Sequence, residues 1–233
     1  MGQYYLSFDV GLANLAFTLC ELDDSLTYCT VVDARCVNTM IYTHESVTED
    51  ECLLHHTKEA YDRIMHFIQE YAHIWESKKP LKRVFIERQP ICGLNHVESI
   101  LFSEFREIAV KISPNAMHTW LKINHLDYDG RKVETVRLAR IYLEDLDGFN
   151  IKRQHDMADA LMILFYGVHL EKISTDKEAL LKSQRKSFKR KVGVSMDEYF
   201  NNFKYTTLPD KNRPTKKLKI KKDNYLDTFK YKS

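Results

Sequence analysis

The sequence contains little of what several common functional sites require. It has only seven glycines among 233 residues. Near its start it has a D-x-G motif, Asp9 to Gly11, as sugar kinases and actin-like ATPases do, but it lacks their Gly-rich phosphate loops. The cysteines are odd in number, scattered and without a CxxC pair, which excludes a zinc site or a disulfide framework. We interpret most of them as buried thiols: Cys20, Cys29, Cys36, Cys52 and Cys92.

Long apolar runs and targeting signals are also missing. No run approaches the ~20 residues of a membrane-spanning helix. The first residues lack the basic and apolar regions of a signal peptide and the Arg/Ser-rich character of a transit peptide. We therefore expect a soluble, intracellular protein with no membrane partner.

The charge that is present is unevenly distributed. Residues 1–170 carry 17 basic and 25 acidic side chains, a net charge of −8, whereas residues 171–233 carry 18 and 8, a net charge of +10. An acidic body with a basic tail is typical of a protein that reaches a polyanion through the tail; the alternative is a solvated helix with a disordered end. We expect a folded domain over residues 1–172 and a basic extension over 173–233, partly helical or disordered.

The hydropathy pattern predicts an α/β fold with a mixed sheet and helices on both faces. Strands are expected at 3–9, 13–22, 26–37, 82–87 and 115–121, and helices at 48–78, 95–112, 132–146, 155–172 and 176–191. A turn at Gly11 joins the first two strands as a hairpin, and Thr48 with Glu51 has capping-box spacing. Residues 122–131 are expected to form a loop, and 201–233 to be poorly ordered.

Two acidic residues follow predicted strands. Asp9 ends the first strand, and Glu87 ends the buried-type strand "VFIE". Sites in open α/β sheets form beyond the carboxyl ends of strands, so two neighbouring strands can bring both acids to one edge. Alternation along the first strand puts Asp9 on the side opposite Leu6 and Phe8.

A second pair of acids begins an apolar helix. In "QHDMADALMILF", Asp156 and Asp159 are three residues apart and share one helix face. The alternative role for such a pair is to stabilise the positive end of the helix dipole. If all four acids meet, their mutual repulsion requires cations, and carboxylate oxygens favour Mg²⁺ or Mn²⁺. Two such ions can activate water and stabilise the leaving oxygen of a phosphodiester.

Three motifs together resemble the RuvC-like Holliday junction resolvases. They are "FDVGLANLAF", "VFIERQP" and "HDMADALMI", and the form D-x-G-x-x-N-L-A is most similar to the branch of poxvirus, other large DNA virus and fungal mitochondrial resolvases. The resemblance covers residues 3–170. It implies a ribonuclease H-like fold, a homodimer and paired symmetric nicks in four-way DNA junctions. It also implies a catalytic site with two Mg²⁺ ions, which Mn²⁺ can replace, held by Asp9, Glu87, Asp156 and Asp159.

Basic residues near these motifs are candidates for DNA contacts. The segment from 113 to 143 resembles the connecting region of the family, and in it we assign Lys122, Arg131 and Lys132 to DNA phosphates. Arg88 and Gln89 follow Glu87 directly and are also candidates. Solvated surface side chains are the alternative for each of them. We interpret Asn14 as fixing a turn and His155 as a helix-cap or surface residue.

The sequence therefore predicts a metal-dependent, structure-selective endodeoxyribonuclease that resolves four-way junctions in DNA recombination, repair or replication. A viral protein of this kind would act where viral DNA replicates, in the cytoplasm or the nucleus. Two alternatives stay open. One is another ribonuclease H-like nuclease, acting on RNA–DNA hybrids or as an exonuclease. The other is a catalytically inactive DNA-binding protein.

Overall fold

A computed structural model of the chain describes residues 2–11, 13–39, 59–76, 79–90, 93, 95–144, 146, 153–191 and 230–231. The chain divides into two compact units, Met1–Leu170 with Tyr225–Ser233, and Glu171–Asn224. The sheet and all of the predicted site residues belong to the first unit.

The described strands form a six-stranded sheet in the order β5-β4-β1-β2-β3-β6. Their bounds are β1 Gln3–Asp9, β2 Asn14–Leu22, β3 Tyr28–Asn38, β4 Leu81–Glu87, β5 Ala109–Ile112 and β6 Lys230–Tyr231. β1, β2 and β3 are antiparallel neighbours, which confirms the predicted hairpin and third strand. β4 and β5 run parallel to β1. The carboxyl ends of β1, β4 and β5 therefore share one edge of the sheet.

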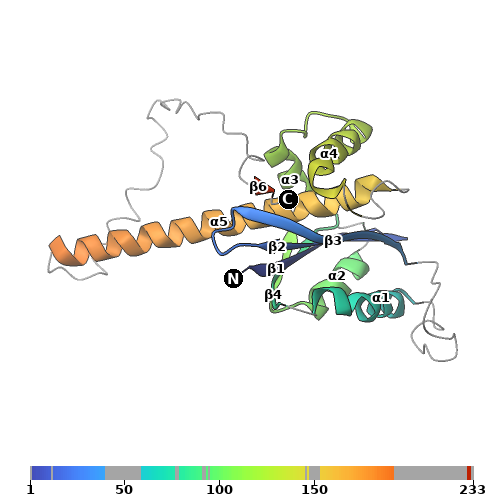
Figure 1. The fold of residues 1–233 in the computed structure, drawn as a ribbon, viewed down its shortest axis with the longest axis horizontal. Coiled ribbons are helices and arrows are strands. Elements are labelled where there is room, and N and C mark those ends of the chain that lie inside the picture. The colour runs from blue at the N-terminus through green and yellow to red at the C-terminus, as the bar shows by residue number, and fades with distance from the viewer. Residues whose placement is uncertain are drawn as a thin grey trace. The chain divides into compact units, whose positions relative to one another are not determined.

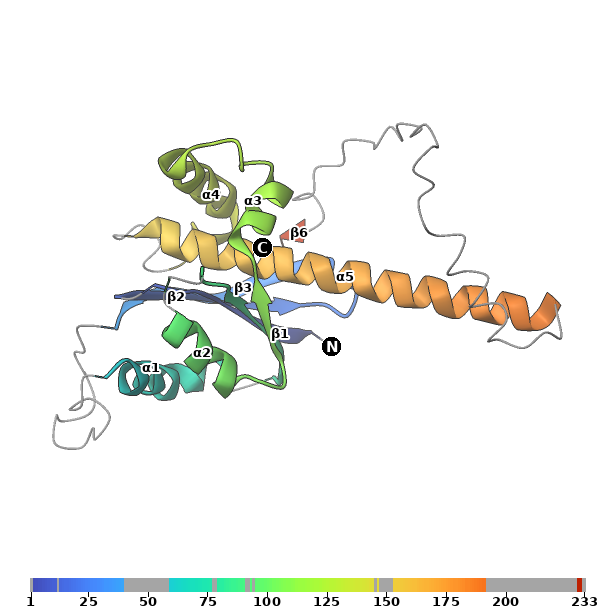
Figure 2. The ribbon, with the colours of Figure 1, turned by 180° about the vertical axis from the view of Figure 1, so that it is seen from behind.

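Helices cover both faces of this sheet, as predicted. The described helices are α1 (Ala60–Trp75), α2 (Asn95–Glu104), α3 (Pro114–Leu121), α4 (Tyr128–Leu143) and α5 (Gln154–Lys191). α1 and α2 lie on one face, and α3, α4 and the first turns of α5 lie on the other (Figures 1 and 2). Leu6 and Phe8 pack in the α1–α2 core, whereas Tyr5 packs in the α5 core. Side-chain alternation along β1 thus has the predicted phase.

The N-terminal half of α5 packs directly against β1 and β4. Buried Ser7 donates a hydrogen bond from its Oγ to the carbonyl oxygen of Ala160, at 2.6 Å. Further along α5, a Cβ atom added to Gly167 would lie 2.6 Å from Cγ of Phe85 on β4. The absence of a side chain at Gly167 lets the helix approach β4 closely. These two contacts fix the height of α5 above the strand ends.

Two predicted elements were wrong. The helix expected at 95–112 ends at Glu104, and residues 109–112 form β5. This short edge strand pairs with β4, so a long-range partner decides its conformation. The strand expected at 115–121 is helix α3. Pro114 stands in the first turn of α3 after the extended Ser113, where its missing N–H and fixed φ favour a helix.

Other predicted boundaries shift or lie outside the described residues. Helix α4 begins at Tyr128, inside the loop expected at 122–131, because Asp127 accepts a hydrogen bond from the backbone N–H of Gly130 at 2.8 Å. The two helices expected at 155–172 and 176–191 are one helix, α5.

Of the helix expected at 48–78, the part before residue 59 is outside the described ranges, and so is the tail from 201 apart from β6. Within the described ranges, every helix is too short or too polar to cross a membrane.

Candidate active site

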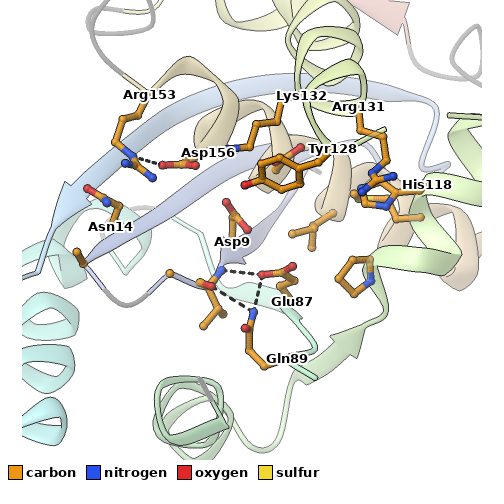
Figure 3. Close-up of a pocket in the computed structure, with 17 residues that line it drawn as sticks. Asp9, Asn14, Glu87, Gln89, His118, Tyr128, Arg131, Lys132, Arg153 and Asp156 are labelled. Carbon is orange, nitrogen blue, oxygen red and sulfur yellow. Dashed lines mark hydrogen bonds and ion pairs between the residues drawn. The ribbon is translucent and has the colours of Figure 1, made fainter. Parts of the chain in front are cut away.

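The ends of β1 and β4 bring two carboxyl groups together. Phe8 lies opposite Ile86 in the parallel ladder, so Asp9 and Glu87 follow at neighbouring positions on the sheet edge. Strand alternation directs both toward the face covered by α5. The backbone N–H of Val10 donates to Glu87 Oε2 at 3.2 Å, and the Asp9 carboxyl group lies close to that of Glu87. Figure 3 shows the two side chains near each other, among the other labelled residues of the site.

The first turns of α5 add the other two acids. Asp156 and Asp159 lie on one face of the helix and border the same cavity as the strand-end acids, with a volume of about 350 Å³. Asp156 is only 8% exposed, and Asp159 lies near the buried Thr135 of α4, whose hydroxyl donates to the carbonyl oxygen of Arg131 at 3.0 Å. Three separate parts of the sequence thus deliver carboxyl groups to one cavity.

Burial and nearby charges perturb the pKa values of Asp9, Glu87 and Asp159. Burial raises the pKa of Asp9 well above its usual range, and the charges of Glu87, Asp159 and Asp156 raise it further. Burial likewise raises the pKa of Glu87, although hydrogen bonds to its carboxylate oppose this. For Asp159, burial and then the charges of Glu87 and Asp156 raise the pKa to about 7, although the nearby Thr135 hydroxyl and the Lys132 charge oppose this. Without a cation, the cluster therefore retains protons near neutral pH.

Asp156 has partners of its own at the beginning of α5. Its Oδ2 forms an ion pair with Nε of Arg153, which Figure 3 shows as a dashed line. His155 Nε2 lies 3.0 Å from its Oδ1, and Cys36 on β3 donates from Sγ to Oδ2 at 3.5 Å. Burial, followed by the Asp156 charge, raises the pKa of the Cys36 thiol to about 12. Cys36 therefore stays a thiol that supports the carboxylate.

The donor set of the cavity matches a hard divalent cation in chemistry. Four carboxyl groups offer only oxygen ligands, and a cation would relieve the repulsion that raises the pKa values of Asp9 and Asp159. Among the described residues, however, no three His, Cys, Asp or Glu side chains are arranged to hold an ion as they stand. Arg153 already contacts Oδ2 of Asp156, so an ion would compete with this pair for that oxygen.

The predicted DNA contacts separate into two groups. Gln89, Arg131 and Lys132 line the cavity. Arg88 and Lys122 are exposed and lie outside the described lining of this cavity. Lys132 places Nζ 4.4 Å from the ring centroid of Tyr128, and Arg131 donates from Nη1 to the carbonyl of Leu126 at 2.7 Å.

Several cavity residues were not predicted from the sequence. His118 belongs to α3, which we expected to be a strand, and Tyr128 to a helical turn that we expected to be a loop. Arg153 has a signal in the sequence, because it precedes Asp156 by three residues. Asn14, interpreted as a turn residue, also lines the cavity. A side chain on Gly11 would collide with the Asn14 carbonyl, so the tight turn beside Asp9 requires glycine.

Comparison with solved structures places this architecture in a known fold. The chain is similar to the fowlpox virus resolvase in complex with its substrate Holliday junction DNA, with a TM-score of 0.50, 13% identity, and coverage of 72% of this chain and 97% of that one. A second structure, of the fowlpox virus Holliday junction resolvase, is similar with a TM-score of 0.50 and 11% identity, over 72% of this chain and 99% of that one. For Thermus thermophilus RuvC the TM-score is 0.43 and the identity 13%, over 69% of this chain and 92% of that one.

No protein-family model matches the chain, and no curated protein matches it in sequence. The structural similarity confirms the predicted α/β ribonuclease H-like fold, in the form that RuvC-like Holliday junction resolvases have. At these identities the similarity establishes the fold alone.

Proposed function

We propose that the chain is a divalent-metal-dependent endonuclease that makes paired, symmetric nicks in four-way DNA junctions. One observation carries this function: carboxyl groups at the ends of β1 and β4 and at the start of α5 line a single cavity. The fold is shared with fowlpox virus resolvase, which was solved with Holliday junction DNA. Asp9, Glu87, Asp156 and Asp159 are the proposed catalytic residues and metal ligands.

The chain's own residues have separate tasks in this mechanism. Asp9 and Glu87 are fixed in place by the strand ends that carry them, and Asp159 on α5 holds a proton until the carboxylates are neutralised. Two Mg²⁺ or Mn²⁺ ions held by the four acids would supply activation of water and stabilisation of the leaving oxygen. Arg131 and Lys132 border the cavity and would neutralise phosphates next to the bond that is cut.

Pairing of the nicks requires two active sites. A homodimer with two-fold symmetry would present two acid cavities to a four-way junction, which has two-fold symmetry of its own. Recognition would depend mainly on DNA shape and backbone, because lysine and arginine contacts to phosphate carry no sequence information.

The test is a cleavage assay on a labelled, mobile four-way junction, with Mg²⁺ and with EDTA, in which cuts on all four strands are mapped. We expect symmetric cuts on two opposing strands in Mg²⁺ and none in EDTA. Asp9→Asn should abolish cleavage and leave junction binding intact. Asp24→Asn is the matched control, since Asp24 is exposed in the turn between β2 and β3, at the opposite edge of the sheet.

The same assay separates the alternatives. Preferential cleavage of an RNA–DNA hybrid, or trimming from a 3′ end, would indicate a different ribonuclease H-like nuclease. Junction binding without cleavage in Mg²⁺ would indicate a catalytically inactive DNA-binding protein. Full cleavage by a pure Asp9→Asn/Asp156→Asn double variant would reject the mechanism.

A further inference from the structure

A second hollow adjoins the acid cavity on the outer side of α4. It has a volume of about 740 Å³ and is formed by one face of α4 and by the residues that begin α5. Lys132 and Arg153 line both this hollow and the acid cavity. We call it the basic groove, and its defining side chains are Lys132, Val133, Val136, Arg137, Arg140 and Arg153.

The groove combines positive charge with apolar surface. Four of its defining side chains are cationic, and none of its described lining residues is a carboxylate. Arg140 is exposed, and Val133 is 71% exposed. A sugar–phosphate backbone has the complementary chemistry, because anionic phosphates alternate with apolar deoxyribose faces.

We propose that the basic groove binds the sugar–phosphate backbone of the DNA strand that continues from the bond cut in the acid cavity. This role rests on the proposed function. Continuity supports it, since a strand that leaves the acid cavity past Lys132 and Arg153 enters the groove directly. Arginine is suited to the task because its planar fork of donors matches phosphate oxygens.

Two of the arginines are ion-paired in the structure, and neither pair prevents phosphate binding. Arg137 contacts Glu134 on the same helix through Nε at 2.8 Å and Nη2 at 2.6 Å, but its side chain is 65% exposed. Exposed pairs of this kind are weak and exchange readily. Arg153 donates to Asp156 through Nε, and a guanidinium has five N–H donors, so others stay available to a phosphate.

Arg153 is also held in an unusual backbone conformation. Its φ of 76° is in the left-handed region, which a non-glycine residue adopts only when its surroundings enforce it. This conformation precedes α5 and sets the side chain between the acid cavity and the groove, as Figure 3 shows on the cavity side. Arg153 thereby connects the carboxylate that it holds with the proposed path of the DNA backbone.

A second copy of the chain is the other occupant to consider. A two-fold interface centred on the groove would set the same cations of each copy against each other, which opposes association. The charge of the groove therefore favours DNA, and self-association through this face becomes an outcome that the experiment detects.

The experiment measures junction binding by the full chain in EDTA, by fluorescence anisotropy over a range of KCl concentrations. We expect Arg137→Gln/Arg140→Gln to bind about tenfold or more weakly. Its plot of log affinity against log salt should be shallower by about two, since each lost phosphate contact lowers the slope by about 0.9. The control, Lys82→Gln/Arg106→Gln, removes two exposed charges at the opposite edge of the sheet. It should change the junction affinity by less than twofold and leave the slope of the salt plot unchanged.

A variant that adds charge to the groove provides a second test, because a misfolded protein would not bind the junction more tightly. Val133→Lys adds a cation at an exposed position in the groove, so it should tighten junction binding several-fold and steepen the salt dependence by about one phosphate contact. Unchanged affinity and slope in both groove variants would overturn the proposal. A loss of self-association in the groove variants, measured by sedimentation equilibrium, would also overturn it, because the groove would then be a contact between copies.

These results are independent of catalysis. If the groove variants behave as expected but wild type cuts no DNA, the groove proposal stands and the nuclease mechanism fails. If wild type cuts junctions and the groove variants bind normally, the groove proposal alone fails. If wild type binds no branched DNA, both are overturned.

Discussion

The side-chain amide of Gln89 joins the two strand ends that carry the first pair of acids. Its Nε2 donates to Glu87 Oε2 at 2.7 Å and lies 3.2 Å from the carbonyl oxygen of Val10 (Figure 3). Gln89 as a DNA contact stays a prediction, and these bonds from Nε2 give the side chain a second role, which is to orient Glu87. Gln89→Ala should therefore lower the single-turnover cleavage rate about tenfold and leave junction affinity within twofold.

Gln69→Ala is the matched control for this prediction, because Gln69 is exposed on α1, on the other face of the sheet. A fall in junction affinity as large as the fall in rate would show that Gln89 contacts DNA instead. An unchanged cleavage rate would show that Glu87 needs no such support.

The strand-end acids were predictable because strands have a simple geometry. Alternation along "YYLSFD" and the shared carboxyl edge of parallel strands sufficed to bring Asp9 and Glu87 to one place, and the three-residue spacing of Asp156 and Asp159 gave their common helix face. Their joint role as metal ligands stays a prediction.

The region between Glu87 and α4 was less predictable because long-range contacts decide it. Ile108, Val110 and Ile112 alternate as in a strand, but this signal is only a few residues long and directly follows a helix. Pro114 is compatible with both the end and the start of a helix. The contacts of Arg153 and Cys36 with Asp156 depend on how α5 meets the sheet, which the sequence does not specify.

Asp159 makes the stability of the metal-free protein depend on pH. Its carboxyl has a pKa raised to about 7 by burial and by neighbouring carboxylates, whereas an unfolded aspartate titrates near about 3.9. The folded state binds more protons between these values, so stability falls as pH rises from about 4 to about 7. Asp159→Asn cannot ionise. In EDTA it should be more stable than wild type above about pH 7, by on the order of 1–3 kcal/mol, with the advantage vanishing near about pH 4.

Urea denaturation in EDTA at several pH values measures this difference, and Asp24→Asn serves as the control at an exposed position. Millimolar Mg²⁺ should stabilise wild type at high pH more than Asp159→Asn, because a bound cation removes the repulsion. A variant that is equally or less stable than wild type at every pH would contradict the assigned environment of Asp159.

A buried ion pair supports the segment that carries Gln89. Glu98 of α2 is 5% exposed. Its Oε1 lies 2.6 Å from Nζ of Lys111 on β5, and its Oε2 accepts the backbone N–H of Gln89 at 2.6 Å. Lys111→Met leaves the Glu98 carboxylate buried without its cation, which should lower the free energy of unfolding by about 3 kcal/mol.

A double-mutant cycle tests this coupling. Glu98→Gln keeps an acceptor for the Gln89 N–H but sets an uncharged amide against Lys111. In the Glu98→Gln/Lys111→Met double variant no buried charge is left unpaired, so it should be more stable than the sum of the single effects predicts, by about 1–3 kcal/mol. Additive losses would show that the two side chains act independently.

The close approach of α5 to β4 is the packing feature on which the cavity depends, because it sets the helix-borne acids against the strand ends. A Cβ at position 167 would lie 2.6 Å from Cγ of Phe85, far inside van der Waals contact. Gly167→Ala should therefore destabilise the protein by about 1–3 kcal/mol through overpacking, although alanine is intrinsically favoured in a helix by about 1 kcal/mol.

The companion variant Phe85→Leu removes the ring that the new methyl group would meet. Combined with Gly167→Ala, it should cost less than the two single losses together, because the methyl group fills space that the ring vacated. Thermal unfolding of the four proteins measures this. If Gly167→Ala alone raises the melting temperature, helix propensity outweighs the contact, and α5 has room to move away from β4.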